Sequence, residues 1–202
     1  MASPTIEKLI ESLDNDLPRS ALVQEKLPAL AAAFDAERMK PTLQDMLNCH
    51  PKGKTLVIEI KDGPETAHQV KKEIEATGRP MSEYKVISFN FDTCQEARKI
   101  MPDVEVYFLL GAENKKTKKV EKFTEDVIKK AKDANLTGVN LDYHGLTPEF
   151  IKQCKDMGMH IYAWTVNEQA DVEQLTKWGI EAITTNHVEK TRKWMEKALE
   201  EK

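Results

Sequence analysis

The chain has 202 residues, of which 40% are hydrophobic and 32% charged, the ordinary balance of a globular protein with one sizeable core. Its formal net charge of −4 argues against a nucleic-acid-binding protein. No run of about 18 apolar residues occurs, so no membrane span is expected. The N-terminus shows no basic start followed by an apolar run. The sequence as given therefore predicts a cytoplasmic protein, or a periplasmic or secreted one if a signal-bearing N-terminus has been removed.

The first 50 residues predict helices and no strand. Helical segments are expected at residues 6–13 and 20–34, with Pro18, Pro28 and Pro41 as breaks. We expect an N-terminal helical segment, residues 1–50, and a second part, residues 51–202, in one structural domain overall.

From residue 55 onward, short β-branched or aromatic runs alternate with charged segments of helical spacing. The predicted strands are residues 56–60, 86–89, 104–110, 139–143, 161–166 and 182–185. The predicted helices are residues 65–77, 93–100, 124–134, 147–157, 171–178 and 187–201. These six βα units are typical of a parallel sheet with helices outside it.

Local signals mark several of the helix ends. Asp92 and Thr147 are expected as N-caps, and Pro148 suits a first helical position. Gly158 and Gly179 are expected to end the helices that precede them.

The predicted strand at residues 55–61 carries two charges at its carboxyl end. Side chains alternate along a strand, so Glu59 and Lys61 share one face, opposite the apolar Ile58 and Ile60. Two readings are open: a functional pair at a site, or a Glu–Lys pair on an edge strand.

Other polar and aromatic residues also cluster at predicted strand ends. Trp164 is either a core residue of the sheet or a wall for a ligand, and Tyr143 and His144 follow another strand. His144 is either a loop residue or a ligand or proton-transfer group. The lysine-rich segment 115–122 is read as a solvated loop, with a phosphate-attracting patch as the alternative.

Five motifs, in order over residues 40–190, resemble the glycerophosphodiester phosphodiesterase family. They are residues 40–47 (KPTLQDML), 56–61 (LVIEIK), 87–90 (ISFN), 163–167 (AWTVN) and 179–185 (GIEAITT). The resemblance implies a TIM-type (β/α) barrel, incomplete here, with about six parallel strands and an N-terminal helical region. It also implies metal-dependent hydrolysis of small-molecule glycerophosphodiesters to glycerol 3-phosphate and an alcohol.

Carried over residue by residue, the resemblance assigns a site. Glu59 matches the metal-ligating glutamate, for a divalent cation that is magnesium or calcium. Lys61 matches the catalytic lysine that contacts the phosphate, and Trp164 matches the aromatic residue that packs against glycerol. Tyr143 and His144 are expected to bind substrate beside them.

Other family motifs have no match before residue 40. These are the first-strand His-Arg-Gly, the following Glu-Asn-Thr, the second-strand Glu-x-Asp, and a later His-Asp. The predicted strands would then be barrel strands three to eight, with an incomplete metal site. We expect the 202-residue chain to hydrolyse glycerophosphodiesters at least ~10³-fold more slowly than an intact family member.

Two rival readings stay open. One is a non-catalytic barrel fragment that acts as a ligand-binding or interaction module, and the other is a different βα-barrel enzyme with a convergent likeness. A barrel without two strands also leaves open sheet edges, at residues 56–60 and 182–185. We expect either that residues 1–50 cover the gap or that two chains associate across it.

Overall fold

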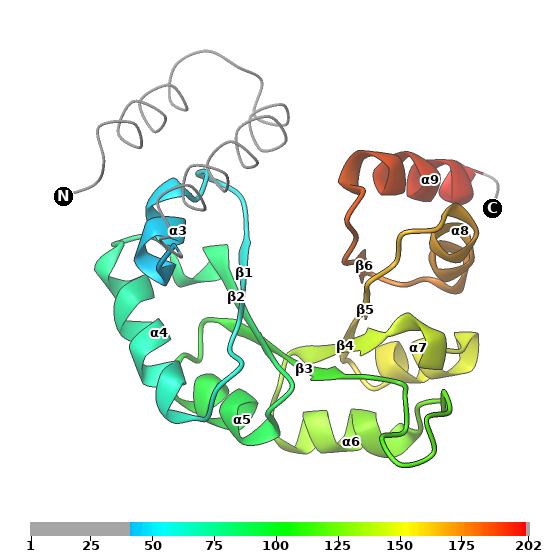
Figure 1. Ribbon diagram of the computed structural model, residues 1–202, viewed down its shortest axis with the longest axis horizontal. Coiled ribbons are helices and arrows are strands. Elements are labelled where there is room, and N and C mark those ends of the chain that lie inside the picture. Colours follow the sequence, from blue (N-terminus) through cyan, green and yellow to red (C-terminus); the bar gives the residue numbers. More distant parts are fainter. Residues whose placement is uncertain (1–40, 201–202) are drawn as a thin grey trace. The chain divides into compact units, whose positions relative to one another are not determined.

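The computed structural model describes residues 41–200 (Figure 1). The helices expected at residues 6–13 and 20–34 therefore lie outside the described residues. The chain divides into two compact units, residues 1–54 and 55–202. The expectation that the two parts make one structural domain stays a prediction. No helix among residues 41–200 is both long and apolar enough to cross a membrane.

In the first unit, the described part contains helix α3 (Leu43–Cys49). Thr42 caps it by a reciprocal capping box with Asp45: the Asp45 N–H donates to the Thr42 hydroxyl, and the Thr42 N–H donates to the Asp45 carboxylate. The Thr42 hydroxyl and the Thr42 N–H both donate to the Asp45 carboxylate, and these two hydrogen bonds lower the pKa of Asp45. The helix implied by the motif at residues 40–47 is confirmed.

The second unit is built on six parallel strands that lie side by side in sequence order. They are β1 (Leu56–Glu59), β2 (Tyr84–Ser88), β3 (Glu105–Leu110), β4 (Gly138–Asp142), β5 (His160–Trp164) and β6 (Ala182–Ile183). The predicted number, direction and order are confirmed. Strands β1 and β6 are the two edges of the sheet.

A helix follows each strand, as the βα pattern predicts. The helices are α4 (Glu65–Ala76), α5 (Phe91–Ile100), α6 (Glu125–Asp133), α7 (Pro148–Asp156), α8 (Gln169–Trp178) and α9 (Val188–Glu200). Two 3₁₀ turns, η1 (Met81–Glu83) and η2 (Tyr143–Gly145), precede β2 and follow β4. Figure 1 shows the sheet of this unit curling into half of a barrel, with α4 to α7 on its outer, convex side.

Alternation of side chains along each strand decides which residues reach the inside of the curl. In β2, Tyr84, Val86 and Ser88 are fully buried on the helix side, whereas Lys85 and Ile87 are partly exposed on the concave face. In β1, Ile58 is likewise buried, as is Ile60 just after the strand, whereas Val57 and Glu59 on the opposite face are exposed.

The curl is strong enough that side chains from β2 and β5 meet. Strands three places apart in a flat sheet would be about 14 Å apart. Yet Lys85 Nζ lies 2.9 Å from the Tyr162 hydroxyl, and the rings of Phe89 and Trp164 have centroids 5.5 Å apart. The concave face is therefore filled by side chains, as in the layered interior of a TIM barrel.

Most of the local signals are confirmed. Thr147 accepts a hydrogen bond from the Phe150 N–H as the N-cap of α7, Pro148 opens that helix, and Gly179 ends α8 with a φ of 87°. One predicted N-cap, Asp92, was wrong. Asn90 caps α5 instead, because the Asn90 side chain accepts hydrogen bonds from two backbone N–H groups of the first turn.

Five of the six expected strands end one or two residues earlier than predicted, and only β3 ends where it was expected. Phe89 follows β2, and Tyr143 belongs to η2 rather than to β4. The carboxylate of Asp142 accepts the His144 N–H, and this cap turns the chain out of the strand into the 3₁₀ turn.

Candidate functional site

The carboxyl ends of the six strands share one rim because every strand runs in the same direction. The sequence-predicted site residues all lie at this rim. They are Glu59 and Lys61 after β1, Tyr143 and His144 after β4, and Trp164 at the end of β5. Their convergence on one ligand stays a prediction.

Glu59 and Lys61 form a loose pair on the edge strand. Glu59 Oε2 lies 4.0 Å from Lys61 Nζ, and their side chains are 33% and 78% exposed. Neither charge is fully buried, and an exposed ion pair of this kind contributes little to stability. Lys61 presents its ammonium group to solvent, where it can meet an anion.

An aromatic wall stands at the same rim. The Trp164 ring packs edge-to-face against Phe89, and its Nε1–H donates to the Asn140 carbonyl at 3.0 Å. Phe89 is 52% exposed. We missed Phe89 in the sequence analysis, although it continues the Lys85 and Ile87 alternation onto the concave face.

Phe89 of this wall and Lys61 follow the ends of neighbouring strands, β2 and β1. Glu59 pairs with Ile87 in the parallel ladder, and the Ile60 N–H donates to the Ile87 carbonyl at 2.9 Å. Lys61 and Phe89 both follow the carboxyl ends of these two adjacent strands. A cation and a flat apolar surface thus come from adjacent strands.

Asn140 adds a polar group to the concave face. The residue is 4% exposed, and its Oδ1 is buried with no hydrogen-bond donor from the described residues. A buried acceptor without a partner costs roughly 1–3 kcal/mol, so this atom is suited to accept a hydrogen bond from water or a ligand.

His144 is oriented by Asp142. Its Nδ1 lies 2.7 Å from Asp142 Oδ1, and the same carboxylate accepts from the His144 N–H and the Ala112 N–H. An ionised carboxylate only accepts, so the proton sits on Nδ1 and Nε2 is left as the basic nitrogen. The ring is 55% exposed, which makes Nε2 a proton acceptor at the rim.

Tyr143 lies against the His144 ring, with the two ring centroids 3.9 Å apart. Burial, reinforced by the charge of Asp171 and a hydrogen bond to it, raises the pKa of the Tyr143 hydroxyl. Tyr143 is therefore neutral near pH 7 and its hydroxyl is engaged with the start of α8. Asp171 was not anticipated from the sequence.

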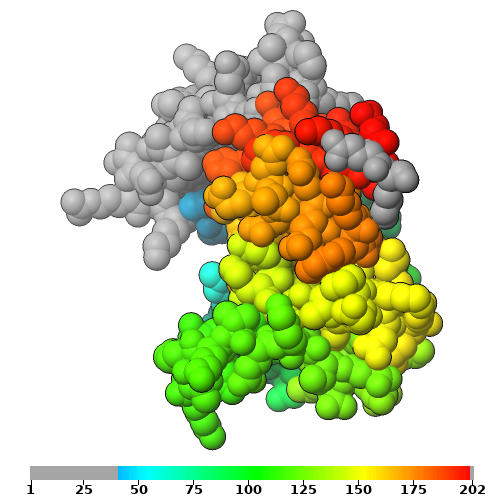
Figure 2. All heavy atoms as spheres, turned by 90° about the vertical axis from the view of Figure 1, so that its right-hand side faces the viewer, coloured from blue at the N-terminus to red at the C-terminus, as the bar shows by residue number. Residues whose placement is uncertain are grey.

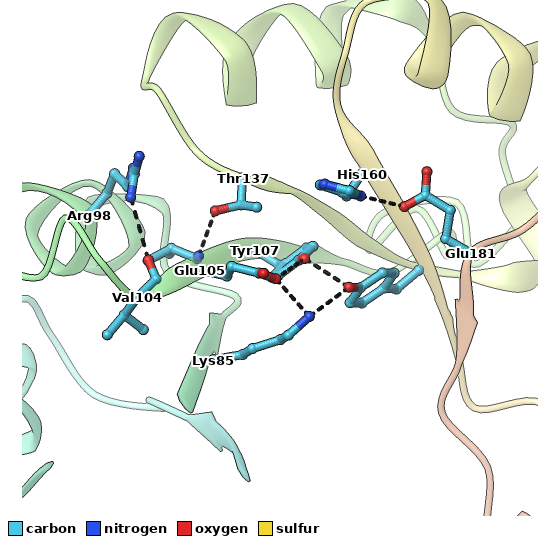
Figure 3. Close-up of polar contacts among 10 residues, drawn as sticks. Lys85, Arg98, Val104, Glu105, Tyr107, Thr137, His160 and Glu181 are labelled. Carbon is cyan, nitrogen blue, oxygen red and sulfur yellow. Dashed lines mark hydrogen bonds and ion pairs between the residues drawn. The ribbon is translucent and has the colours of Figure 1, made fainter. Parts of the chain in front are cut away.

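Beneath the rim, four polar side chains from three strands close a ring of hydrogen bonds (Figure 3). Lys85 Nζ lies 2.6 Å from Glu105 Oε2 and 2.9 Å from the Tyr162 hydroxyl. The Tyr107 hydroxyl lies 2.5 Å from Glu105 Oε2 and 2.8 Å from the Tyr162 hydroxyl, and the two tyrosine rings stack. Because the single Tyr107 proton goes to the carboxylate, Tyr162 donates to the Tyr107 oxygen.

Two neighbouring members of this ring, Lys85 and Glu105, are charged, and the two tyrosines are neutral. Burial alone would lower the pKa of Lys85, but the hydrogen bonds to Glu105 and Tyr162 outweigh it and the net shift is upward. Burial alone would raise the pKa of Glu105, but Lys85 and Tyr107 reverse the sign. Burial and the bond to Glu105 raise the pKa of Tyr107. The ring is a closed structural layer of the half-barrel with no group left for chemistry.

The described residues do not make a divalent cation site. Among residues 41–200, no group of three or more His, Cys, Asp or Glu side chains is placed to hold a metal ion. Glu59 is one carboxylate with an ammonium group 4.0 Å away, whereas Mg²⁺ and Ca²⁺ need several oxygen ligands. The metal-ligating role of Glu59 stays a prediction.

The family of this chain follows from its sequence. The model of the "Glycerophosphoryl diester phosphodiesterase family" matches residues 10–190. The chain belongs to this family. The match begins 30 residues before the motifs found by inspection, and it removes the reading of a convergent likeness.

Individual relatives agree with the family assignment. A glycerophosphodiester phosphodiesterase of Bacillus subtilis is 25% identical over 156 residues, which are 73% of this chain and 51% of that protein. A crystal structure of a glycerophosphodiester phosphodiesterase from Parabacteroides distasonis matches with a TM-score of 0.66 and 27% identity, over 79% of this chain and 65% of that chain. This chain thus spans about half to two thirds of the length of these relatives.

A more distant structure shares the fold. An Oleispira antarctica phosphodiesterase in complex with the product sn-glycerol-3-phosphate matches with a TM-score of 0.63 and 16% identity, over 77% of this chain and 61% of that chain. Together these structures confirm the TIM-barrel fold class.

The five histidines of the chain all fall within the described residues. His50 is bonded to a backbone carbonyl in the first unit, and His68 pairs with a glutamate on the neighbouring helix. His160 pairs with Glu181 at the amino end of β5 (Figure 3). His144 and His187 follow the carboxyl ends of β4 and β6, and His144 has the Asp142 hydrogen bond that fixes its tautomer.

Proposed function

We propose that the carboxyl rim of this family member binds glycerophosphodiesters and their product glycerol 3-phosphate. The observation that carries this proposal is the Phe89–Trp164 wall at the same rim as the exposed Lys61, which follows the strand next to that of Phe89. Lys61 would contact the phosphate, and the aromatic wall would pack against the glycerol carbons. Tyr143 and His144 would line the same rim.

We further propose that the chain by itself hydrolyses these substrates slowly. Cleavage needs a proton acceptor for the attacking water and a proton donor for the leaving alkoxide, each contributing roughly 10²–10⁴-fold. The Asp142–His144 pair supplies one acid–base group, and one carboxylate, Glu59, supports a magnesium or calcium ion poorly. Turnover should therefore be at least ~10³-fold below that of an intact family member.

Binding and turnover are tested separately. NMR titration with sn-glycerol 3-phosphate should shift the indole N–H of Trp164, and Lys61→Ala should weaken binding by about tenfold. Lys72→Ala, an exposed lysine on α4, is the matched control and should bind like the wild type. No shift at Trp164, or equal weakening by both variants, would contradict the assigned site.

The turnover assay measures release of glycerol 3-phosphate from glycerophosphocholine, with magnesium and calcium supplied in turn. We expect a rate near background with either ion. Robust metal-dependent turnover that Lys61→Ala abolishes would overturn the claim of slow catalysis and leave the binding proposal standing.

A second candidate function is that of an interaction module. Its support is the edge strand β6, where residues of β6 and α9 line an open groove of about 510 Å³. The groove is lined largely by apolar and threonine side chains: Ile183, Thr184, Thr185, Val188, Thr191, Arg192, Met195, Glu196 and Leu199. Self-association without binding of glycerol 3-phosphate would favour this function over the first.

A further inference from the structure

The segment between β3 and α6 is a structured hairpin, although the sequence favoured a solvated loop. An antiparallel bridge joins Glu113 to Val120, and the Asn114 N–H donates to the Lys119 carbonyl at 2.9 Å. The Asn114 side chain accepts from two backbone N–H groups at the tip. We call residues 113–122 the basic hairpin. It leaves the carboxyl end of β3 and projects from the body of the second unit (green, lower left in Figure 2).

The basic hairpin concentrates positive charge on an acidic protein. Its ten residues contain five lysines and two glutamates, a net charge of +3, whereas the whole chain carries −4. Lys118 pairs with Glu113 at 3.1 Å. Lys115, Lys116 and Lys119 are exposed around the tip.

An apolar side chain stands among these lysines. Val120 is 56% exposed, next to Lys119 and two residues from Lys122. The pattern pairs cations on long flexible stems with one apolar group, which suits the boundary between charged headgroups and acyl chains.

The base of the hairpin is fastened to the rim. Lys122 Nζ donates to the His144 carbonyl at 2.8 Å, and the Phe123 N–H donates to the Gly145 carbonyl at 3.1 Å. The Phe123 ring also packs against Phe150 of α7. Whatever the hairpin binds is therefore held beside the turn that carries His144.

We infer that the basic hairpin binds the surface of an anionic phospholipid bilayer. Complementary charge and the exposed Val120 both favour this partner. A nucleic acid is disfavoured because the hairpin has no arginine and no aromatic side chain, the groups that read or stack on bases. The inference stands apart from the proposed binding of glycerol 3-phosphate, since it concerns a different set of side chains.

The strength of the effect follows from the number of lysines. A lysine close to an anionic leaflet raises membrane partitioning about fivefold, so three lysines together contribute about 100-fold. This attraction falls as salt shortens the Debye length.

The experiment is co-sedimentation of the full chain with large vesicles of phosphatidylcholine containing about one third phosphatidylserine, and with vesicles of phosphatidylcholine alone. The test variant is Lys115→Gln/Lys116→Gln/Lys119→Gln, which leaves the contacts of Lys118 and Lys122 in place. The matched control is a triple substitution of exposed lysines on α4 and α9, K72Q/K190Q/K193Q, which changes the net charge equally.

We expect binding to the anionic vesicles that the hairpin triple lowers about 100-fold and the control triple lowers less than fivefold. Binding should also weaken strongly between about 0.1 M and about 0.5 M salt, and Val120→Ser should lower it severalfold at the lower salt. Equal losses in both triples would reduce the effect to net charge and overturn the inference. So would equal binding to neutral vesicles, no binding to either, or tighter binding to single-stranded DNA than to the anionic vesicles.

Discussion

The hydrogen-bonded ring under the rim offers a sharp test of how the half-barrel is held together. Lys85→Met keeps the length of the side chain but removes the ammonium group that donates to Glu105 and Tyr162. Breaking a fully buried pair costs roughly 3–5 kcal/mol, whereas an exposed pair is worth about 0–1 kcal/mol. The Lys85 side chain is 20% exposed and that of Glu105 46%, so screening reduces the loss to about 2 kcal/mol.

Unfolding in urea followed by tryptophan fluorescence measures this loss in the relevant part of the chain, because all three tryptophans lie in residues 55–202. Lys99→Met is the matched control. Its side chain is 75% exposed and its Nζ lies 3.3 Å from Glu96 Oε2, so the change should stay within about 0.5 kcal/mol.

The cost should depend on pH with a definite sign. The folded-state pKa of Glu105 is lowered, so its stabilisation is present above the unfolded pKa of about 4.3 and is lost as the pH falls through the folded pKa. The folded-state pKa of Lys85 is raised, so its stabilisation is complete below about pH 10.4 and is lost as the pH rises further. A loss no larger than that of Lys99→Met, or one that persists unchanged at acid pH, would refute the reasoning.

Three further predictions concern packing, thiols and edges. Gly138→Ala should destabilise the chain by about 2–3 kcal/mol or more in urea unfolding, because a Cβ there would overlap the His160 carbonyl, whereas Gly111→Ala should cost less than about 0.5 kcal/mol, since its Cβ meets open space; equal costs would contradict this. Burial raises the pKa of both Cys94 and Cys154 to about 12, so in a Cys49→Ser variant a thiol reagent at pH 8 should modify them only after unfolding, and rapid labelling of that native variant would show that they are accessible. If chains pair across the open edges of β1 and β6, light scattering at high concentration should give a mass well above 23.0 kDa, and a monomer throughout would argue against self-association.

Much of the architecture could be predicted because it is local in the sequence. Side chains alternate between the two faces of each strand. The helical segments between consecutive strands are long enough to connect them in parallel. The same alternation correctly separated the buried Ile58 from Glu59 and Lys61 on the open face. The cap of α5 was misplaced because Asp92 and Asn90 are both good caps in isolation, and only the backbone geometry distinguishes them.

The part of the site that the sequence could indicate is the set of residues at strand ends. Lys61 and Trp164 each lie near the carboxyl end of a predicted strand, and parallel strands bring such ends to one rim. Asp142 lies two residues before His144 in the sequence, but its role as the orienting carboxylate depends on the turn that folds the imidazole back onto it.

By itself, the sequence determined the six strands, their order, the face that each side chain occupies and the family to which the chain belongs. Only the tertiary structure decided that Phe89 stands against Trp164 and that Lys85 reaches Tyr162. The physical reason is distance along the chain. Alternation is set by neighbouring residues, whereas the curl of the sheet joins side chains about 75 residues apart, and no local pattern encodes how far a sheet will curl.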